Sequence, residues 1–192
     1  MDNMSSKGQV KGRPLSTEVA DAVFKAALDL IEESGLEQIT RLQIANRAQV
    51  SRQTLYNRWA SVGDIVLDAL VARGEREIGG KDQGEVKLEP RAALREYVSG
   101  LAEALQGWAA PGLKAVAALA QQDAKFGQRF RHDFIARRHG RLLQAVTEAC
   151  DKPAQNPLLI AEFIAASMWY RLLISGQALD QGWVDAMLAQ LD

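Results

Sequence analysis

The sequence predicts an all-α protein of about nine helices, with an N-terminal three-helix domain that contains a helix-turn-helix and a larger C-terminal helical domain. Apolar residues recur three or four positions apart along most of the 192 residues, as in helices with one buried face. Many of them are Ala and Leu, which favour helix. Capping residues, Gly and Pro separate these apolar segments. We expect an arm at residues 1–14, a first domain at 15–74 and a second at 75–192.

The composition is that of an ordinary soluble globular protein, with 47% hydrophobic and 24% charged residues. The single cysteine, Cys150, excludes an intramolecular disulfide and fits a reducing compartment. The N-terminal region lacks the apolar segment of a signal peptide. No uninterrupted apolar run approaches the ~20 residues needed to cross a bilayer. We therefore expect a cytoplasmic protein without a membrane partner.

Residues 1–14 are polar and rich in Gly, with Pro14 at their end, which predicts a flexible basic arm. Such arms reach into a minor groove or touch phosphates. A disordered tail is the alternative, and it is the simpler interpretation for all of these residues except Arg13. The first helix should follow at about residues 18–34 and end at Gly35.

Two short helices with a tight turn between them are predicted next. Thr40 is placed to cap the first, and Gln43 follows three residues later, the spacing of a capping box. Gln49 and Val50 form the turn. Ser51 is placed to cap the second short helix, because its side-chain oxygen can accept a backbone N–H of the first turn.

The second short helix, residues 52–59, has two different faces. Leu55 and Trp59 fall on one side, which packs inward, and the other side carries guanidinium, amide and phenol groups. Such groups suit base edges and phosphates. Four arginines and no acidic residue lie between Thr40 and Trp59, in a chain of net charge −1. A basic island on an acidic remainder indicates a polyanion site.

This segment resembles the DNA-binding segment of TetR-family transcriptional regulators over residues 17–70. The matching positions are Gly35, Thr40, Ile44, Ala45, Ala48, Val50, Ser51, Thr54, Leu55, Tyr56, Trp59 and Ser61. Two positions depart from the family pattern. Gln49 stands where the family usually has Gly, which costs about 1 kcal/mol if this position needs a positive φ, and Val62 stands where a phosphate-binding Lys is common.

The resemblance implies a sequence-specific DNA-binding regulator whose usual mode is repression. We predict that Arg52, Gln53 and Asn57 read bases. Thr54 contacts either a base or a phosphate. The other predicted DNA-binding residues position phosphates or the helix itself: Thr40, Arg41, Ser51, Tyr56 and Arg58.

The C-terminal part predicts further helices after one at 62–78 and a polar loop at 81–89. They should lie at 90–106, 112–122, 124–150, 158–174 and 181–191. The long helix has a basic face, made of Arg129, Arg131, Arg137, Arg138 and Arg141. We expect that face to be solvated or to flank a dimer interface, with a second DNA site as the alternative.

The helix at residues 158–175 is apolar on almost all sides, so it must be buried on almost all sides. Together with the helix at 181–191 it resembles the helix pair through which TetR-family proteins form homodimers. A homodimer would place two recognition helices on a palindromic double-stranded DNA operator. A purely intramolecular core is the competing interpretation.

The resemblance also implies a pocket for a small, largely apolar effector among the C-terminal helices. The predicted lining residues are Trp108, Phe126, Phe130, Phe163 and Met168. A ligand-independent regulator or an activator is the alternative. An enzyme ranks third, because His132 and His139 lack the partners of a metal site and no phosphate-binding loop or nucleophile motif is present. We expect no cofactor and no metal.

Overall fold

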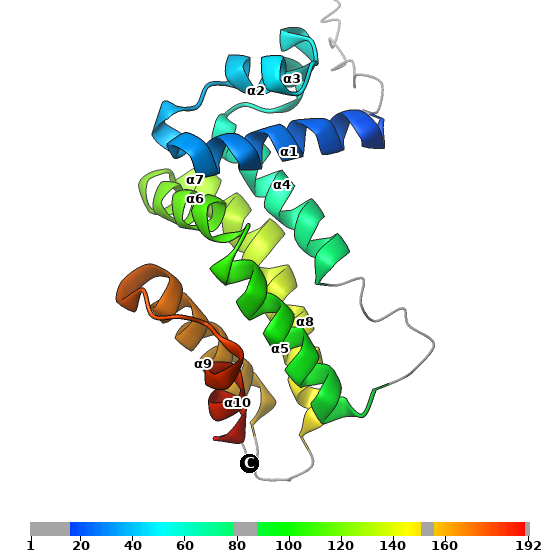
Figure 1. Cartoon of the computed structure of the whole chain (residues 1–192), viewed down its shortest axis with the longest axis vertical. Helices are drawn as coiled ribbons and strands as arrows, with labels where there is room; N and C mark the ends of the chain where they lie inside the picture. The colour runs from blue at the N-terminus through cyan, green and yellow to red at the C-terminus, as the bar shows by residue number, and fades with distance from the viewer. Residues whose placement is uncertain (1–15, 79–87, 151–155, 191–192) are drawn as a thin grey trace, which may run out of the picture.

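The computed structural model describes residues 16–78, 88–150 and 156–190, and all of its regular structure is helical (Figure 1). The all-α prediction is confirmed, since the described residues form nine continuous helices and no strand. The predicted arm at residues 1–14 and all of the predicted loop except residues 88 and 89 lie outside the described residues.

The two short helices begin directly after their predicted caps, Thr40 and Ser51. α1 covers Thr17–Ser34, α2 covers Arg41–Arg47 and α3 covers Arg52–Arg58. Thr40 and Gln43 form the predicted capping box, with Gln43 N donating to Thr40 Oγ1 over 3.2 Å. A short 3-10 helix at Leu36–Gln38, which the sequence pattern did not indicate, joins α1 to α2.

The remaining helices form the larger C-terminal part. α4 covers Val62–Glu77, α5 Pro90–Gln106, α6 Ala110–Gln122, α7 Ala124–Phe130, α8 Ala136–Ala149, α9 Pro157–Tyr170 and α10 Gln181–Ala189. α7 and α8 run on from each other through a π-helical turn at Arg131–Ile135, and α9 ends in a second at Arg171–Ser175. The predicted helix positions are therefore right to within a few residues, and the π-helical turns were not predicted.

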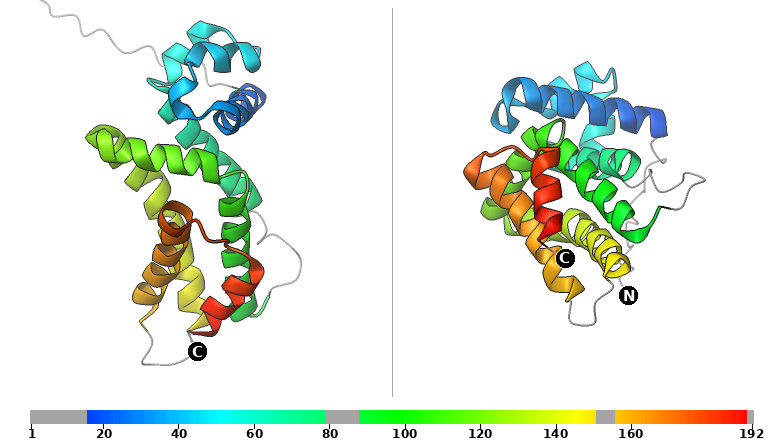
Figure 2. Two further views of the ribbon diagram at one scale, coloured as in Figure 1. Left: turned by 60° about the vertical axis from the view of Figure 1, so that its left-hand side comes forward. Right: turned by 60° about the horizontal axis from the view of Figure 1, so that its bottom comes forward.

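The helices are arranged along one long axis. α2 and α3 lie at one end beside α1, α4 descends from them, and α9 and α10 lie toward the opposite end with α5 and α8 (Figures 1 and 2). One hydrophobic cluster continues from α1–α4 into α6 and α7, and a second lies among α5, α8, α9 and α10. The N-terminal helices thus share their core with the first helices of the C-terminal part, and the predicted boundary at residues 74 and 75 falls inside α4.

Candidate nucleic-acid interface and internal cavity

The inner face of α3 is buried as predicted. Leu55 is 0% exposed and Trp59 is 2% exposed. The indole Nε1 of Trp59 donates to Asp68 Oδ2 on α4 over 2.8 Å, and its ring meets Phe24 of α1 edge-on at 6.0 Å. These contacts fix the orientation of α3 and leave its opposite face to solvent.

That opposite face presents the predicted base-reading residues. Arg52, Gln53 and Asn57 are all exposed. Gln53 Nε2 donates to Asn57 Oδ1 over 2.6 Å, which leaves the Gln53 carbonyl oxygen and the Asn57 amide hydrogens for other partners. Arg52 makes no hydrogen bond or ion pair with the part of the chain that the structure describes. An acceptor, a donor and a free guanidinium therefore lie together, as readout of base edges requires.

The predicted phosphate-contacting residues are partly engaged within the protein. Arg41 Nη1 donates to the Trp59 carbonyl over 2.9 Å, and its guanidinium stacks 3.8 Å from the ring centre of the exposed Tyr56. The Thr40 hydroxyl lies in the capping box of α2, and the Ser51 hydroxyl caps α3 and contacts the Thr54 hydroxyl at 2.8 Å. These contacts fix the positions of the side chains around the exposed face of α3.

An ion pair with another helix reduces the positive charge of the basic segment between Thr40 and Trp59. Both guanidinium nitrogens of Arg47 bind the carboxylate of Glu33 on α1, at 2.8 and 2.9 Å. The hydrogen bond from Arg47 lowers the pKa of Glu33. Arg41, Arg52 and Arg58 remain as the cations of the exposed surface. Val62 packs partly buried against the core.

The turn between α2 and α3 needs a positive φ. Gln49 has φ 56°, and it is the one non-glycine residue with a positive φ among those described. Because this position has a positive φ, a glutamine here costs stability relative to glycine. The strain lies directly before α3, whose cap, Ser51, follows two residues later.

A cluster of charges joins α3 and α4 to α7. Arg129 of α7 binds Asp64 through Nη1 at 2.6 Å and also binds Asp68, the acceptor of Trp59. Its Nε donates to Asp133 at 3.2 Å, and the hydrogen bond from His132 together with the charge of Arg129 lowers the pKa of Asp133. We call Arg129, Asp64 and Asp68 the α4–α7 clamp.

The basic face of the long helix was interpreted wrongly for three of its five arginines. Arg129, Arg138 and Arg141 contact α4, through the clamp, the Gly74 carbonyl and Glu75 respectively. Arg131 and Arg137 are exposed, as expected. The signal for this contact was the acidic series Asp64, Asp68 and Glu75 on one helix, which complements the basic series on another.

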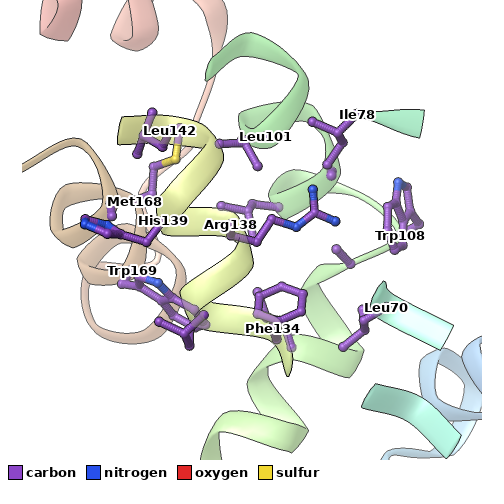
Figure 3. Close-up of a pocket in the computed structure, with 16 residues that line it drawn as sticks. Leu70, Ile78, Leu101, Trp108, Phe134, Arg138, His139, Leu142, Met168 and Trp169 are labelled. Atoms are coloured by element: carbon purple, nitrogen blue, oxygen red, sulfur yellow. The ribbon is translucent and has the colours of Figure 1, made fainter. Parts of the chain in front are cut away.

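A largely apolar cavity of about 110 Å³ lies where α4, α5, α6, α8 and α9 meet. This volume is comparable with that of engineered apolar cavities that bind benzene, about 150 Å³. Figure 3 shows Arg138 reaching from α8 toward Ile78 and Trp108, while His139 lies beside Met168. Leu70 of α4 is also part of the wall.

The cavity contains two of the five predicted lining residues, Trp108 and Met168. Phe126 and Phe130 lie instead in the core around α4 and α6, where Phe130 stacks on Phe134 at 5.6 Å between ring centres. Phe163 is 59% exposed on the outer face of α9. Helical spacing places these aromatic residues on the apolar faces of their helices. It does not predict which neighbouring helix each face contacts.

The outer face of α9 and its π-helical extension is apolar and open. The exposed large hydrophobic residues there are Leu158, Leu159, Phe163, Tyr170, Leu173 and Ile174. Within the described residues, Pro157–Ser175 is the one helix whose length and composition would allow a membrane crossing, with a mean hydropathy of 1.5. Glu162 and Arg171 interrupt its apolar run, and a helix covered by a second subunit has the same composition.

Comparison with known proteins identifies both parts of the chain. Residues 23–69 match the family described as bacterial regulatory proteins, tetR family, and residues 88–191 match the tetracyclin repressor-like C-terminal domain. The chain belongs to the TetR family. It is therefore a DNA-binding transcriptional regulator, and the fold and regulator class predicted from the sequence are confirmed.

Individual TetR-family relatives are distant in sequence. YdeS, an uncharacterized HTH-type transcriptional regulator of Bacillus subtilis (strain 168), is 24% identical over 91% of this chain and 88% of its own length. The TetR-family regulator SCO0332 has a TM-score of 0.71 at 24% identity, over 91% of this chain and 96% of its own. FadR from Bacillus subtilis, solved with stearoyl-CoA, has a TM-score of 0.70 at 17% identity, over 88% and 96%. At these identities the two structures show a shared fold.

Proposed function

We propose that this regulator binds a palindromic operator as a homodimer and represses transcription until a small, largely apolar ligand enters the cavity and releases it. The observation that carries the proposal is the double role of α4. Leu70 of α4 forms part of the cavity wall, and Asp68 on the same helix accepts the hydrogen bond from Trp59 at the end of α3.

The DNA-reading surface of the proposal is the exposed face of α3. Arg52, Gln53 and Asn57 would contact base edges in the major groove, and the Tyr56 hydroxyl and Arg58 would contact phosphates. Arg41 and Thr40 hold this surface in place through their contacts with Trp59 and Gln43. Arg41 has further guanidinium nitrogens with which to reach a phosphate.

The homodimer of the proposal forms through the open apolar face of α9, with α10 beside it. Six large hydrophobic side chains lie exposed along α9 and its extension, a concentration that soluble monomers avoid. Two copies would bring two α3 helices to successive major grooves, about 34–36 Å apart. The symmetry of the dimer is what requires a palindromic operator.

Ligand release follows from the size and place of the cavity. A ligand larger than the cavity volume of about 110 Å³ would press on the cavity walls, and Leu70 of α4 is part of them. Movement of α4 shifts the end of α3 through Asp68 and Trp59, so the two recognition helices lose their spacing. The ligand changes operator affinity only by its differential affinity for the two geometries. The stearoyl-CoA bound to FadR of Bacillus subtilis supports a ligand with an apolar chain.

The experiment begins with an operator selected from random double-stranded DNA by the purified protein. Operator binding is measured by fluorescence anisotropy at two salt concentrations with excess unrelated DNA, and then with octanoate, 1-octanol or stearoyl-CoA added. Saturable binding that survives the competitor and weakens when one of these compounds binds supports the proposal. A compound that binds the protein and leaves operator affinity unchanged would instead establish a ligand-independent regulator.

A further inference from the structure

The cavity contains an arginine whose charge is not balanced. Arg138 projects into a cavity whose other lining residues are apolar apart from His139, and no carboxylate among the described residues pairs with it. It makes a long hydrogen bond of 3.5 Å from Nη1 to the Gly74 carbonyl and lies 5.6 Å from the Phe134 ring centre. The Tyr97 hydroxyl is close to it but does not meet hydrogen-bond geometry. A partly buried guanidinium of this kind is stabilised by a counter-anion.

The neighbours of Arg138 do not supply that anion. Glu75 is already bound to Arg141, which lies one helical turn after Arg138 on α8. Two guanidinium groups and one carboxylate therefore meet, leaving one positive charge in excess. Burial raises the pKa of Tyr97 on α5, while the nearby Arg138 and Arg141 act to lower it, which places the phenol in the same cluster.

Two polar atoms of this cluster also lack partners. Tyr97 Oη and Arg141 Nη1 are buried without a hydrogen-bond partner in the described part of the chain. Buried donors are normally satisfied, so unpaired ones mark a place where an acceptor belongs. Tyr97 lies one turn before Leu101 on α5, which lines the cavity, so the unpaired phenol adjoins the cavity end that Arg138 occupies.

A glycine in α4 leaves space for the Arg138 side chain. Gly74 faces the Arg138 guanidinium so closely that a Cβ at residue 74 would overlap it. The guanidinium is thus held against α4, the helix that connects the cavity to α3. An anion bound by Arg138 would act directly on this contact.

We propose that the effector is an apolar molecule that ends in a carboxylate, and that Arg138 binds the carboxylate with the Tyr97 hydroxyl as a second donor. This inference rests on the proposed function, because it takes the cavity as the effector site. The carboxylate would balance the excess charge, and the hydrocarbon part would fill the space lined by Leu101, Trp108 and Met168. A neutral alcohol of the same chain length would lack the charge, and an acyl-CoA thioester would carry its negative charges on the phosphates of coenzyme A instead of at the end of the chain.

The experiment measures direct binding without DNA. Octanoate, 1-octanol and octanoyl-CoA are titrated into the purified protein by calorimetry and by tryptophan fluorescence, because Trp108 and Trp169 line the cavity. The variants are Arg138→Gln and Arg138→Lys, and the matched control is Arg137→Gln, an exposed arginine of the same helix. Circular dichroism and thermal unfolding verify the fold of each variant.

The expected result is that octanoate binds more tightly than the other two compounds. Arg138→Gln should weaken octanoate roughly tenfold to hundredfold, the loss typical of a hydrogen bond to a charged group. Arg138→Lys should restore part of the affinity, Tyr97→Phe should weaken octanoate and leave 1-octanol unchanged, and Arg137→Gln should change nothing.

Three results would overturn the inference: equal affinity for octanoate and 1-octanol, octanoyl-CoA binding most tightly without regard to Arg138, or no binding of octanoate at all. Because these measurements contain no operator, they separate this inference from the proposed function. If octanoate binds through Arg138 but leaves operator affinity unchanged, the inference about the carboxylate ligand is supported, and the proposal that a ligand releases the operator is wrong. If 1-octanol releases the operator, the proposal that a ligand releases the operator is supported, and the inference that the ligand needs a carboxylate is wrong.

Discussion

At the scale of single residues, Gln49 is the position where the chain holds a strained conformation. Its φ of 56° favours glycine, and a side chain there costs about 1 kcal/mol. We expect Gln49→Gly to raise the free energy of unfolding by about 0.5–1 kcal/mol, since the relief of strain is partly offset by the greater freedom of glycine in the unfolded chain. Urea unfolding followed by circular dichroism measures this change.

Gln49→Ala is the matched control for this prediction. Alanine keeps the strained conformation and removes only an exposed side chain, so it should leave stability nearly unchanged. Equal stabilisation by both substitutions would show that the glutamine side chain, and not the backbone conformation, limits stability.

Arg52 is the residue on which sequence reading by α3 should depend most. It is exposed on the outer face of α3 and has no protein partner in the described residues. We expect Arg52→Ala to weaken binding to the selected operator by about 1–3 kcal/mol and to relax specificity at one base pair. Anisotropy titrations against operators substituted one base pair at a time measure both effects.

The control for Arg52 is Arg47→Gln, which removes an arginine from the same basic segment. Because Glu33 already neutralises Arg47 through two hydrogen bonds, its loss should change operator affinity little. If Arg52→Ala weakens binding equally on every sequence, Arg52 contacts a phosphate and the prediction that it reads a base is wrong.

At the scale of secondary-structure elements, the α4–α7 clamp ties α7 to α4, the helix that contacts the end of α3 through Asp68. Arg129 is partly buried and binds Asp64 and Asp68, and Asp68 also accepts the Trp59 indole. We expect Arg129→Gln to lower the free energy of unfolding by about 1–2 kcal/mol, because two carboxylates then face each other without a cation. It should also weaken the coupling between ligand and operator.

Coupling is measured as the ratio of ligand affinities with and without bound operator. This ratio should move toward one in Arg129→Gln and stay unchanged in Arg131→Gln, whose exposed arginine lies two residues after Arg129. Unchanged coupling in Arg129→Gln would mean that α4 reaches α3 without the clamp, through the Asp68–Trp59 hydrogen bond and the apolar core.

The boundaries of the elements were the most predictable feature of the protein. Ser16, Thr40, Ser51, Ser61, Asp123, Asn156 and Asp180 each accept a hydrogen bond at the start of a helix. A cap involves residues two or three apart, so a short stretch of sequence contains all of its partners. The π-helical turns at Arg131–Ile135 and Arg171–Ser175 escaped prediction because they have no comparable local signal.

At the scale of the whole molecule, the proposed dimer depends on the open face of α9. We expect Phe163→Glu to convert the protein to a monomer and to weaken operator binding by at least tenfold, because one half-site alone no longer gains from the second. Phe163 is 59% exposed in the single chain, so the monomer should keep its fold. Analytical ultracentrifugation measures the association state, and circular dichroism verifies helicity.

Leu88→Glu is the control for the dimer prediction. Leu88 is also an exposed large hydrophobic residue, at 42%, but it lies before α5 and outside the α9 face. It should leave the association state unchanged. A Phe163→Glu protein that stays dimeric would place the interface on another surface.

The sequence by itself determined the features that depend on neighbours along the chain. The all-α class, the helix starts, the buried side of α3 with Leu55 and Trp59, and the exposed side with Arg52, Gln53 and Asn57 follow from helical periodicity and local capping. These features need only the 3.6-residue repeat and partners a few positions away.

The tertiary structure decided which faces meet. It paired Arg47 with Glu33, joined Arg129 to α4, put Trp108 and Met168 in the cavity wall and placed Phe163 on the outside. Arg129 and Asp64 are 65 positions apart, and periodicity assigns a residue to a face without naming the helix that the face contacts. Packing of whole helices chooses those partners, and the free charge of Arg138 in the cavity is one of its results.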